Sequence, residues 1–300
     1  MVQLILNRFI KNVNVVSFSF VRGGAAKAAL RITNAIKLRE PEIAFSYTSV
    51  DHSSENGRRN SRHGIADVCH IFVRLVELVL VTLLRKSNDT KHSINWFGCS
   101  WVENSLDSSQ LNHIHWINNC GIAIGDFHRL SHKSIITLHD EWFYCGAEHY
   151  DVDDTMGFVD GYESEQWRFL SISWLVWRYK KYCYASLKDV IFVVPSLWMA
   201  SRLQQSALLR TYDVRVIPNP IDFSIFQPRP SSKLASELNI QAEDLVVLFG
   251  AVAGRNNVIK GFDLLESALQ GLSNMKDVAP RVKLVCFGGD VGETELYGLP

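Results

Sequence analysis

Short apolar runs alternate with helix-forming segments along almost all of this 300-residue chain, and this alternation limits the possible folds more than any other feature. Strands are expected at residues 13–20, 42–50, 110–117, 133–140, 189–196, 214–220, 244–251 and 281–289. Helices are expected from residue 25 onward and at residues 65–84, 163–187, 197–209 and 261–272. Because strands alternate with helices, the sequence predicts an α/β fold with a mostly parallel sheet.

A proline-rich stretch divides this pattern in two. Residues 218–233 contain four prolines and show little periodicity, which is typical of a linker. We therefore expect an N-terminal Rossmann-like domain at residues 1–222 and a second, partial one at residues 223–300. The second domain would hold only two strands, fewer than a doubly wound domain needs, so we expect it to be incomplete.

The composition favours a globular cytoplasmic protein. Lys+Arg and Asp+Glu both number 31, so the formal net charge is zero, which argues against a nucleic-acid-binding protein. The six cysteines are scattered without a C-x-x-C pair, which indicates reduced thiols rather than a disulfide scaffold. The N-terminal segment lacks the basic, apolar and small-residue order of a signal peptide.

Two segments bear on membrane contact. Residues 71–84 form a long apolar run, but the run is shorter than a spanning helix and contains Arg74 and Glu77. We expect this run to belong to a core-facing helix. The tryptophan-rich, basic residues 167–184 allow either a core helix or peripheral contact with the inner membrane surface.

Polar residues stand at the carboxyl ends of several expected strands. Ligands bind beyond these ends in open parallel sheets, so we expect the residues there to line one crevice. They are Gly23 and Gly24, His115, His139 and Asp140, and Ser196.

Each of these candidates has a structural alternative. His139 and Asp140 could cap the following segment, and the glycine pair could be an ordinary turn, since it lacks the G-x-G-x-x-G fingerprint. His113 and His115 share one face of a strand, but no third metal ligand is evident. Residues 151–154, with the sequence DVDD, could hold a divalent cation with a sugar nucleotide or form a solvated loop.

A second candidate site lies at residues 254–261, GRNNVIKG. Arg255 and Lys260 follow an expected strand and directly precede an expected helix. Two cations beside a helix N-terminus suit a diphosphate, and the alternative is an ordinary basic loop.

Several motifs together resemble family 4 glycosyltransferases. They occur in the family's order and are VRGGAAKAALRI, IHWINNCGIAIGDF, ITLHDEWFYCGAEHY, VPSLWMASRL, VRVIPNPID and FGAVAGRNNVIKGFDLL. The chain looks most like the branch that builds bacterial exopolysaccharide and lipopolysaccharide glycans, such as the colanic acid enzymes. The resemblance implies a GT-B fold, two Rossmann-like domains facing across a cleft. It also implies retaining transfer from a nucleotide-diphosphate sugar to a glycan or lipid-linked acceptor, with no cofactor and no required metal.

The resemblance also implies roles for individual residues. Gly23 and Gly24 would lie near the acceptor and donor phosphates, and His139 would face the transferred sugar. Arg255 and Lys260 would bind the donor diphosphate, so His139, Arg255 and Lys260 are the catalytic candidates. The other substrate-binding candidates are His115, Asp140, Ser196 and Asn219.

One departure from the family leaves other functions open. The family's second domain continues into a paired-glutamate motif that holds the donor, whereas this sequence stops at YGLP. We expect a truncated product, or a second polypeptide that supplies the rest. A non-catalytic or partner-dependent glycan-binding subunit is therefore the main alternative. A nucleotide-sugar epimerase of the same fold is another, and a dinucleotide-dependent dehydrogenase is disfavoured by the missing glycine fingerprint.

Overall fold

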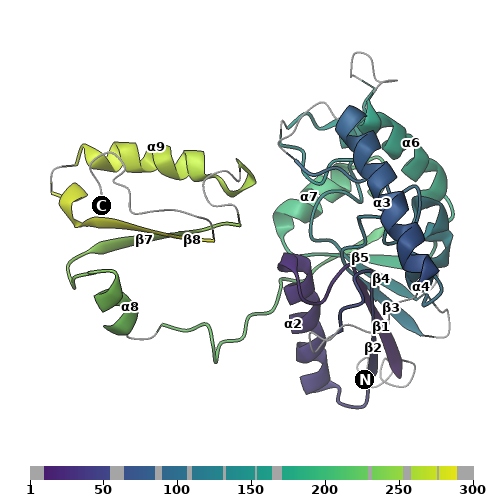
Figure 1. Cartoon of the computed structure of the whole chain (residues 1–300), viewed down its shortest axis with the longest axis horizontal. Helices are drawn as coiled ribbons and strands as arrows, with labels where there is room; N and C mark the ends of the chain where they lie inside the picture. Colours follow the sequence, from purple (N-terminus) through teal and green to yellow (C-terminus); the bar gives the residue numbers. More distant parts are fainter. Residues whose placement is uncertain are drawn as a thin grey trace. The chain divides into compact units, whose positions relative to one another are not determined.

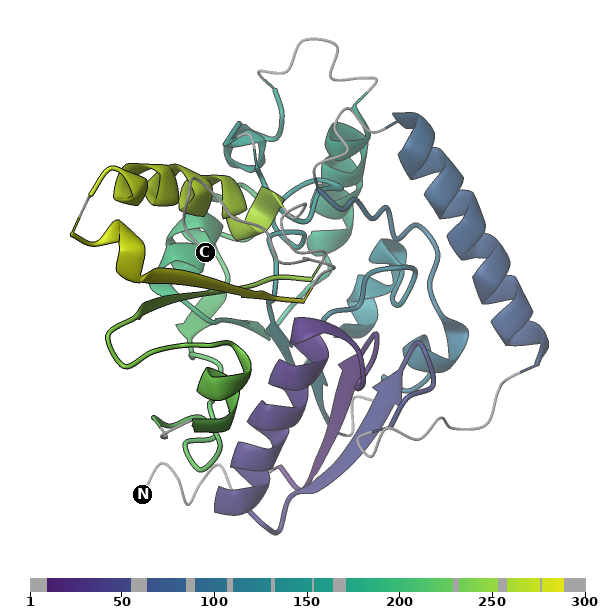
Figure 2. The same cartoon turned by 60° about the vertical axis from the view of Figure 1, so that its left-hand side comes forward.

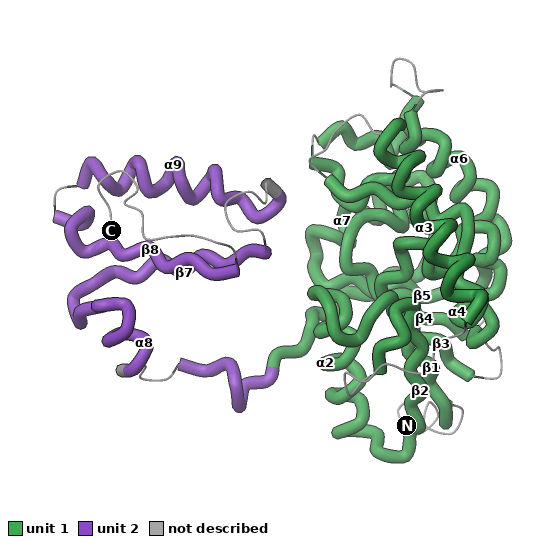
Figure 3. Tube along the Cα trace, viewed as in Figure 1, with its two compact units in different colours: residues 1–221 green, residues 222–300 purple. Residues whose placement is uncertain are grey.

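The chain forms two compact units, which are coloured separately in Figure 3 and comprise residues 1–221 and 222–300. The computed structural model describes residues 10–54, 64–84, 90–106, 110–130, 133–152, 154–163, 171–228, 232–252, 258–275 and 277–288. The linker predicted at residues 218–233 spans the boundary between the two units.

Unit 1 is built on a six-stranded, wholly parallel sheet with the strand order β2-β1-β3-β4-β5-β6 (Figure 1). The strands are β1 (Asn12–Ser17), β2 (Ala44–Ser49), β3 (Leu111–Ile114), β4 (Ser134–Thr137), β5 (Val190–Val194) and β6 (Asp213–Val216). From β1 the chain moves to β2 on one side, and from β3 it moves through to β6 on the other. The topological switch point therefore lies between β1 and β3, which pair directly in the sheet.

The predicted α/β class is confirmed for unit 1, where helices alternate with these strands. The main helices are α2 (Gly23–Arg39), α3 (Ile65–Leu84), α6 (Ile172–Tyr184) and α7 (Leu197–Gln205). Shorter ones are α4 (Ser100–Glu103), η1 (Ile124–Leu130) and α5 (Gly157–Asp160). Ser196 caps α7, because its side chain accepts a hydrogen bond from the backbone N–H of Met199.

The core of unit 1 extends beyond the sheet into the segment that follows β4. Strands β1 and β5 are almost continuously buried, as expected where a parallel sheet is covered on both faces. Trp142, Phe143 and Tyr144 are also buried, and the ring of Phe127 lies 6.3 Å from that of Trp142 and 5.8 Å from that of Phe143. The aromatic residues after His139 are therefore part of the hydrophobic core.

Helix α3 spans the predicted residues, but the prediction that it faces the core is wrong. It runs along the margin of unit 1 and is drawn in blue in Figure 2. Only His70, Glu77 and Val81 are buried on it, whereas Ile65 is 83% and Phe72 65% exposed.

The inward positions of α3 are polar because they bind backbone groups of the neighbouring loops. The Glu77 carboxylate accepts hydrogen bonds from the N–H groups of Ile94 and Asn95, at 2.9 and 3.0 Å. The Nε2 atom of His70 bonds the carbonyl oxygen of Cys120 at 2.9 Å. The helix is thus attached through hydrogen bonds, and most of its apolar side chains remain on the surface.

Helix α6 is a core helix, the first of the two alternatives for the tryptophan-rich segment. The Ser171 side chain caps it by accepting from the N–H of Trp174. Its buried residues are Ile172, Val176, Trp177, Lys180, Cys183 and Tyr184. No helix in the described ranges has the length and hydropathy that crossing a bilayer requires.

Unit 2 is a small α/β unit with two parallel strands, β7 (Leu245–Gly250) and β8 (Val282–Phe287). Its helices are α8 (Ser232–Glu237), η4 (Val258–Lys260), α9 (Phe262–Ser273) and η5 (Ala279–Arg281). Leu269 of α9 and Val282 of β8 are buried at the centre of its core. The predicted parallel α/β pattern is confirmed here too, while the assignment of both units to a GT-B enzyme stays a prediction.

Candidate ligand site at the carboxyl edge of the sheet

A ladder of three histidines occupies the carboxyl ends of β3 and β4. His115 directly follows β3, and its Nδ1 lies 2.9 Å from Nε2 of His139, two residues beyond β4. The ring of His113 lies 4.3 Å from that of His115, and its Nε2 bonds Thr137 Oγ1 at 2.8 Å. Adjacent parallel strands end at the same edge of the sheet, and this register brings His115 and His139 together.

These imidazoles are neutral at neutral pH. Burial lowers the pKa of His113 and of His139 to about 4, and lowers the pKa of His115 well below its ordinary value. The Asp140 carboxylate raises the pKa of His139 but does not outweigh burial. With so low a pKa, His139 is a poor general base at neutral pH, but a neutral imidazole can still donate one hydrogen bond.

One buried ring nitrogen of the ladder helps to decide which ring nitrogen of His139 carries the proton. The Nε2 atom of His115 makes no hydrogen bond to any residue that the structure describes. If His115 donates from Nδ1 to His139, its own Nε2 carries no proton and is an unpaired acceptor. In the opposite tautomer Nε2 of His115 would carry a proton and be a buried, unpaired N–H donor, which is rarer in proteins. The first arrangement is favoured, and it leaves His139, which is partly exposed, with its proton on Nδ1. His139 then offers an N–H donor for an oxygen of a ligand.

Asp140 is held inside the protein by three donors. Its Oδ2 accepts from His149 Nδ1 and Trp116 Nε1, both at 2.6 Å, and its Oδ1 accepts from the N–H of Trp142 at 3.2 Å. Burial would raise the pKa of Asp140, but His149 and Trp116 hold that pKa below its ordinary value. Asp140 orients Trp116 and the loop after β4, and its role as a substrate ligand stays a prediction.

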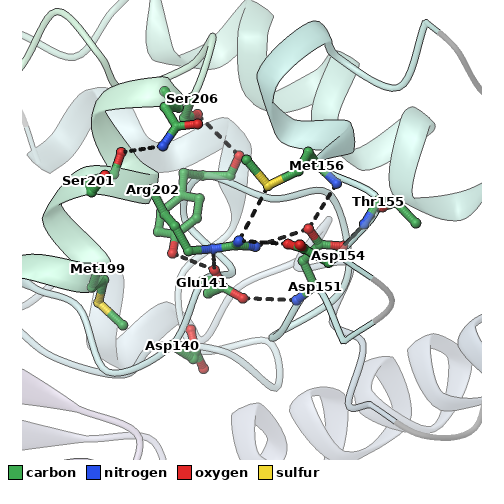
Figure 4. A network of polar contacts seen from close by, with 12 residues as sticks. Asp140, Glu141, Asp151, Asp154, Thr155, Met156, Met199, Ser201, Arg202 and Ser206 are labelled. Carbon is green, nitrogen blue, oxygen red and sulfur yellow. Dashed lines mark hydrogen bonds and ion pairs between the residues drawn. The ribbon is translucent and has the colours of Figure 1, made fainter.

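Glu141, Asp151 and Asp154 are held by an ion-pair network around Arg202 of α7 (Figure 4). The guanidinium bonds Glu141 through Nε, Asp151 through Nη2 at 3.0 Å and Asp154 through Nη1 at 3.1 Å. Asp151 also accepts from the backbone N–H of Thr155 at 3.0 Å. The carboxylates of Asp151 and Asp154 thus bind Arg202, a cation of the protein itself. No group of three or more His, Cys, Asp or Glu among the described residues is arranged to hold a metal ion.

A buried lysine completes this packing. Lys180 of α6 is fully buried, and its ammonium donates to the carbonyl oxygens of Trp142, Cys145 and Gly146. It also lies 3.6 Å from the centroid of the Trp142 ring. The roles of Lys180 and Arg202 could not be predicted from the sequence, because their partners are distant in sequence and no local pattern signals the contacts.

The glycine pair lies beyond the carboxyl end of β1, at the N-terminus of α2. Ser19 Oγ accepts from the N–H groups of Val21 and Arg22, which closes the turn. Gly23 has φ +90°, a conformation that side chains rarely adopt, and a Cβ at either glycine would meet open space. The first turn of α2 has no acidic residue, so this helix end is suited to an anion.

The remaining predicted residues follow other strands, belong to unit 2 or lie outside the described residues. Ser196 follows β5, and Asn219 is exposed three residues beyond β6. Lys260 ends η4 in unit 2, is exposed, and stands just before α9, whose N-cap Gly261 has φ +69°. Arg255 lies outside the described residues.

Comparison with known proteins leaves the family open. No family model matches this chain, and no curated protein matches it significantly. Membership of the glycosyltransferase family is therefore an expectation from the motifs.

Proposed function

We propose that this chain is a retaining glycosyltransferase that moves a hexose from a nucleotide-diphosphate sugar to a glycan or lipid-linked acceptor in cell-surface polysaccharide synthesis. The observation that carries the proposal is the His115–His139 pair at the carboxyl edge of the parallel sheet. This edge is where open α/β sheets bind their ligands.

His139 fits a role in holding the transferred sugar. It is the partly exposed member of a ladder of neutral imidazoles, and its Nδ1 has no bonding partner in the described part of the chain. The neutral imidazole of His139, which His115 holds in place, can donate a hydrogen bond to a sugar oxygen. We do not assign it as a base, because burial lowers the pKa of His139 to about 4.

Lys260 fits a role on the leaving group. As the nucleotide diphosphate departs, negative charge grows on its oxygens, and a fixed cation there stabilises the transition state. Lys260 is exposed, and no ion pair to it is found in the described residues. Arg255, five residues earlier in the sequence, is the proposed second cation.

The test is release of nucleotide diphosphate from a panel of nucleotide sugars, with and without oligosaccharide acceptors. Proton NMR of the product gives the anomeric configuration. We expect His139→Gln and Lys260→Met each to lower turnover by about 10²–10³, the scale for one preorganised contact. The matched controls, exposed His128→Gln and Lys233→Met, should leave turnover unchanged.

Other outcomes contradict the proposal in different ways. Inversion at the anomeric carbon, or full turnover in both His139→Gln and Lys260→Met, refutes the assigned mechanism. Saturable glycan binding with no nucleotide release from any donor favours the glycan-binding subunit instead.

A further inference from the structure

An open groove of about 400 Å³ lies between α3, the segment at Lys91 and His92 before α4, and the loop that follows β3. Its volume falls in the range of sites for small organic ligands. One wall is apolar and comes from Ile71, Leu75, Leu78 and Val81 of α3. Arg74 and Lys91 supply positive charge to the same groove.

The two cations lie at the topological switch point of the sheet. Arg74 Cζ is 5.4 Å from the ring of Phe18, the first residue after β1. Lys91 Nζ is 4.1 Å from the ring of Trp116, two residues after β3. Phe18 and Trp116 pack edge to face at 5.5 Å, and the N–H of Phe18 donates to the Trp116 carbonyl at 2.7 Å. This rigid aromatic pair fixes the place of both cations.

Neither cation has a carboxylate oxygen within 4.0 Å among the described residues. The carboxylates that act on Lys91 from a distance, Glu77 and Asp140, are already bonded. Glu77 accepts from two backbone N–H groups and from Cys120 Sγ, and Asp140 accepts from three donors. Burial removes the Lys91 ammonium from water and lowers the pKa of Lys91 to about 8. A bound anion would therefore stabilise the charged form of Lys91.

We propose that this groove binds a phosphate monoester that carries an apolar chain, with the phosphate between Arg74 and Lys91 and the chain along the apolar wall of α3. A dianion matches two unpaired cations, and charge-assisted hydrogen bonds from Arg and Lys suit phosphate. From Arg74, beside which the phosphate lies, to Val81 the wall is about 10 Å long, the reach of a chain of roughly eight carbons. This charge and length select an amphiphile over free phosphate.

Identifying this ligand as the acceptor substrate rests on the proposed function, but the binding does not. Binding can be measured without any nucleotide sugar. Lys260→Met, which tests sugar transfer, should leave it unchanged.

The experiment is isothermal titration of the full chain with decyl phosphate below its critical micelle concentration. Inorganic phosphate tests the need for the chain, and decyltrimethylammonium, with the same chain and opposite charge, tests the need for the phosphate. We expect both to bind at least about tenfold more weakly than decyl phosphate. Arg74→Gln and Lys91→Met should each weaken decyl phosphate binding about tenfold, as expected for one lost charge-assisted hydrogen bond.

Helix α6 offers matched controls for these substitutions. Arg178 lies 5.6 Å from the ring of Trp174, and Lys181 lies 5.2 Å from that of Trp177, so both are exposed cations over an aromatic ring outside the groove. Arg178→Gln and Lys181→Met should not change the affinity.

Three results would overturn the proposal. They are equal affinity for decyl phosphate and decyltrimethylammonium, equal affinity for decyl phosphate and inorganic phosphate, and unchanged affinity in both groove variants. Binding to anionic lipid vesicles without binding to monomeric decyl phosphate would also overturn it, and would identify α3 as a membrane-docking surface instead.

Discussion

The substitution Arg202→Met should destabilise unit 1 because it leaves a buried carboxylate without its cation. Glu141 is 2% exposed and would keep only Tyr144 Oη and the N–H of Asp151 as donors. Removing one partner of a buried ion pair costs about 3–5 kcal/mol. Because two donors remain on Glu141 and the Asp154 side chain is 77% exposed, we expect the lower end, about 3 kcal/mol.

The assay is urea unfolding followed by tryptophan fluorescence. All eight tryptophans lie in unit 1, so the signal reports this unit alone. In a thermal scan the same loss corresponds to a fall in Tm of about 6–12 °C for a unit of this size.

Two further variants make the reasoning refutable. Arg210→Met, at an exposed arginine whose side chain has no bonding partner in the described residues, should change the free energy of unfolding by less than about 0.5 kcal/mol. The double variant Arg202→Met/Glu141→Gln should be more stable than Arg202→Met, because the uncompensated charge is gone. A loss below about 1 kcal/mol in Arg202→Met, or strictly additive effects in the double variant, would show that the network does not act as an ion pair.

Two other predictions concern the switch point. Gly23→Ala should lower the free energy of unfolding by about 1–2 kcal/mol, since Gly23 has φ +90°, while Gly24→Ala, with open space and no positive φ, should be close to neutral in the same urea assay. Decyl phosphate affinity should fall between pH 7 and pH 9 as Lys91, with its pKa of about 8 in the free protein, loses its proton. The phosphate is a dianion over this range, so Lys91→Met should abolish the pH dependence; an unchanged profile would contradict this assignment. The charged groups that act on the Lys91 ammonium are Arg74, Glu77 and Asp140.

The order of strands and helices could be predicted from the sequence because the parallel strands are buried on both faces and appear as apolar runs. Most strand ends were placed too far along the chain. Phe20 and Leu138 continue the apolar pattern, and both are buried, but they lie beyond the last residues of β1 and β4. Hydropathy detects burial, whereas a strand ends where the hydrogen-bonded ladder ends.

The orientation of α3 could not be predicted, because its inward face is chosen by hydrogen bonding. Glu77 and His70 point inward to bind backbone groups of loops that are between 17 and 50 residues away in sequence. A single sequence shows neither contact, and hydropathy alone favours the opposite face. For the same reason the sequence does not predict that Arg74 and Lys91 line one groove, because that groove depends on the orientation of α3.

The candidate site was predictable where it depends on the sheet and unpredictable where it depends on the loop after β4. His115 and His139 are predicted to lie together because each follows the carboxyl end of a parallel strand, and in the structure their nitrogens are 2.9 Å apart. Asp140 and Asp151 are both candidate ligand residues in the sequence, but each is bound by the protein's own donors.

The polar atoms at the carboxyl edge of unit 1 that have no bonding partner among the described residues indicate which chemical groups a ligand there would present. Two of its carboxylates are already bonded within the protein, Asp140 by His149 and Trp116 and Glu141 by Arg202. The groups left for a ligand are a neutral imidazole at His139 and two cations at the switch point. The imidazole suits a hydroxyl oxygen and the two cations suit a phosphate, and Asp140 and Glu141 are not free to repel either group. The two proposals therefore use different groups at the carboxyl edge of the sheet, His139 for the transferred sugar and the two cations for a phosphate, and separate variants test them.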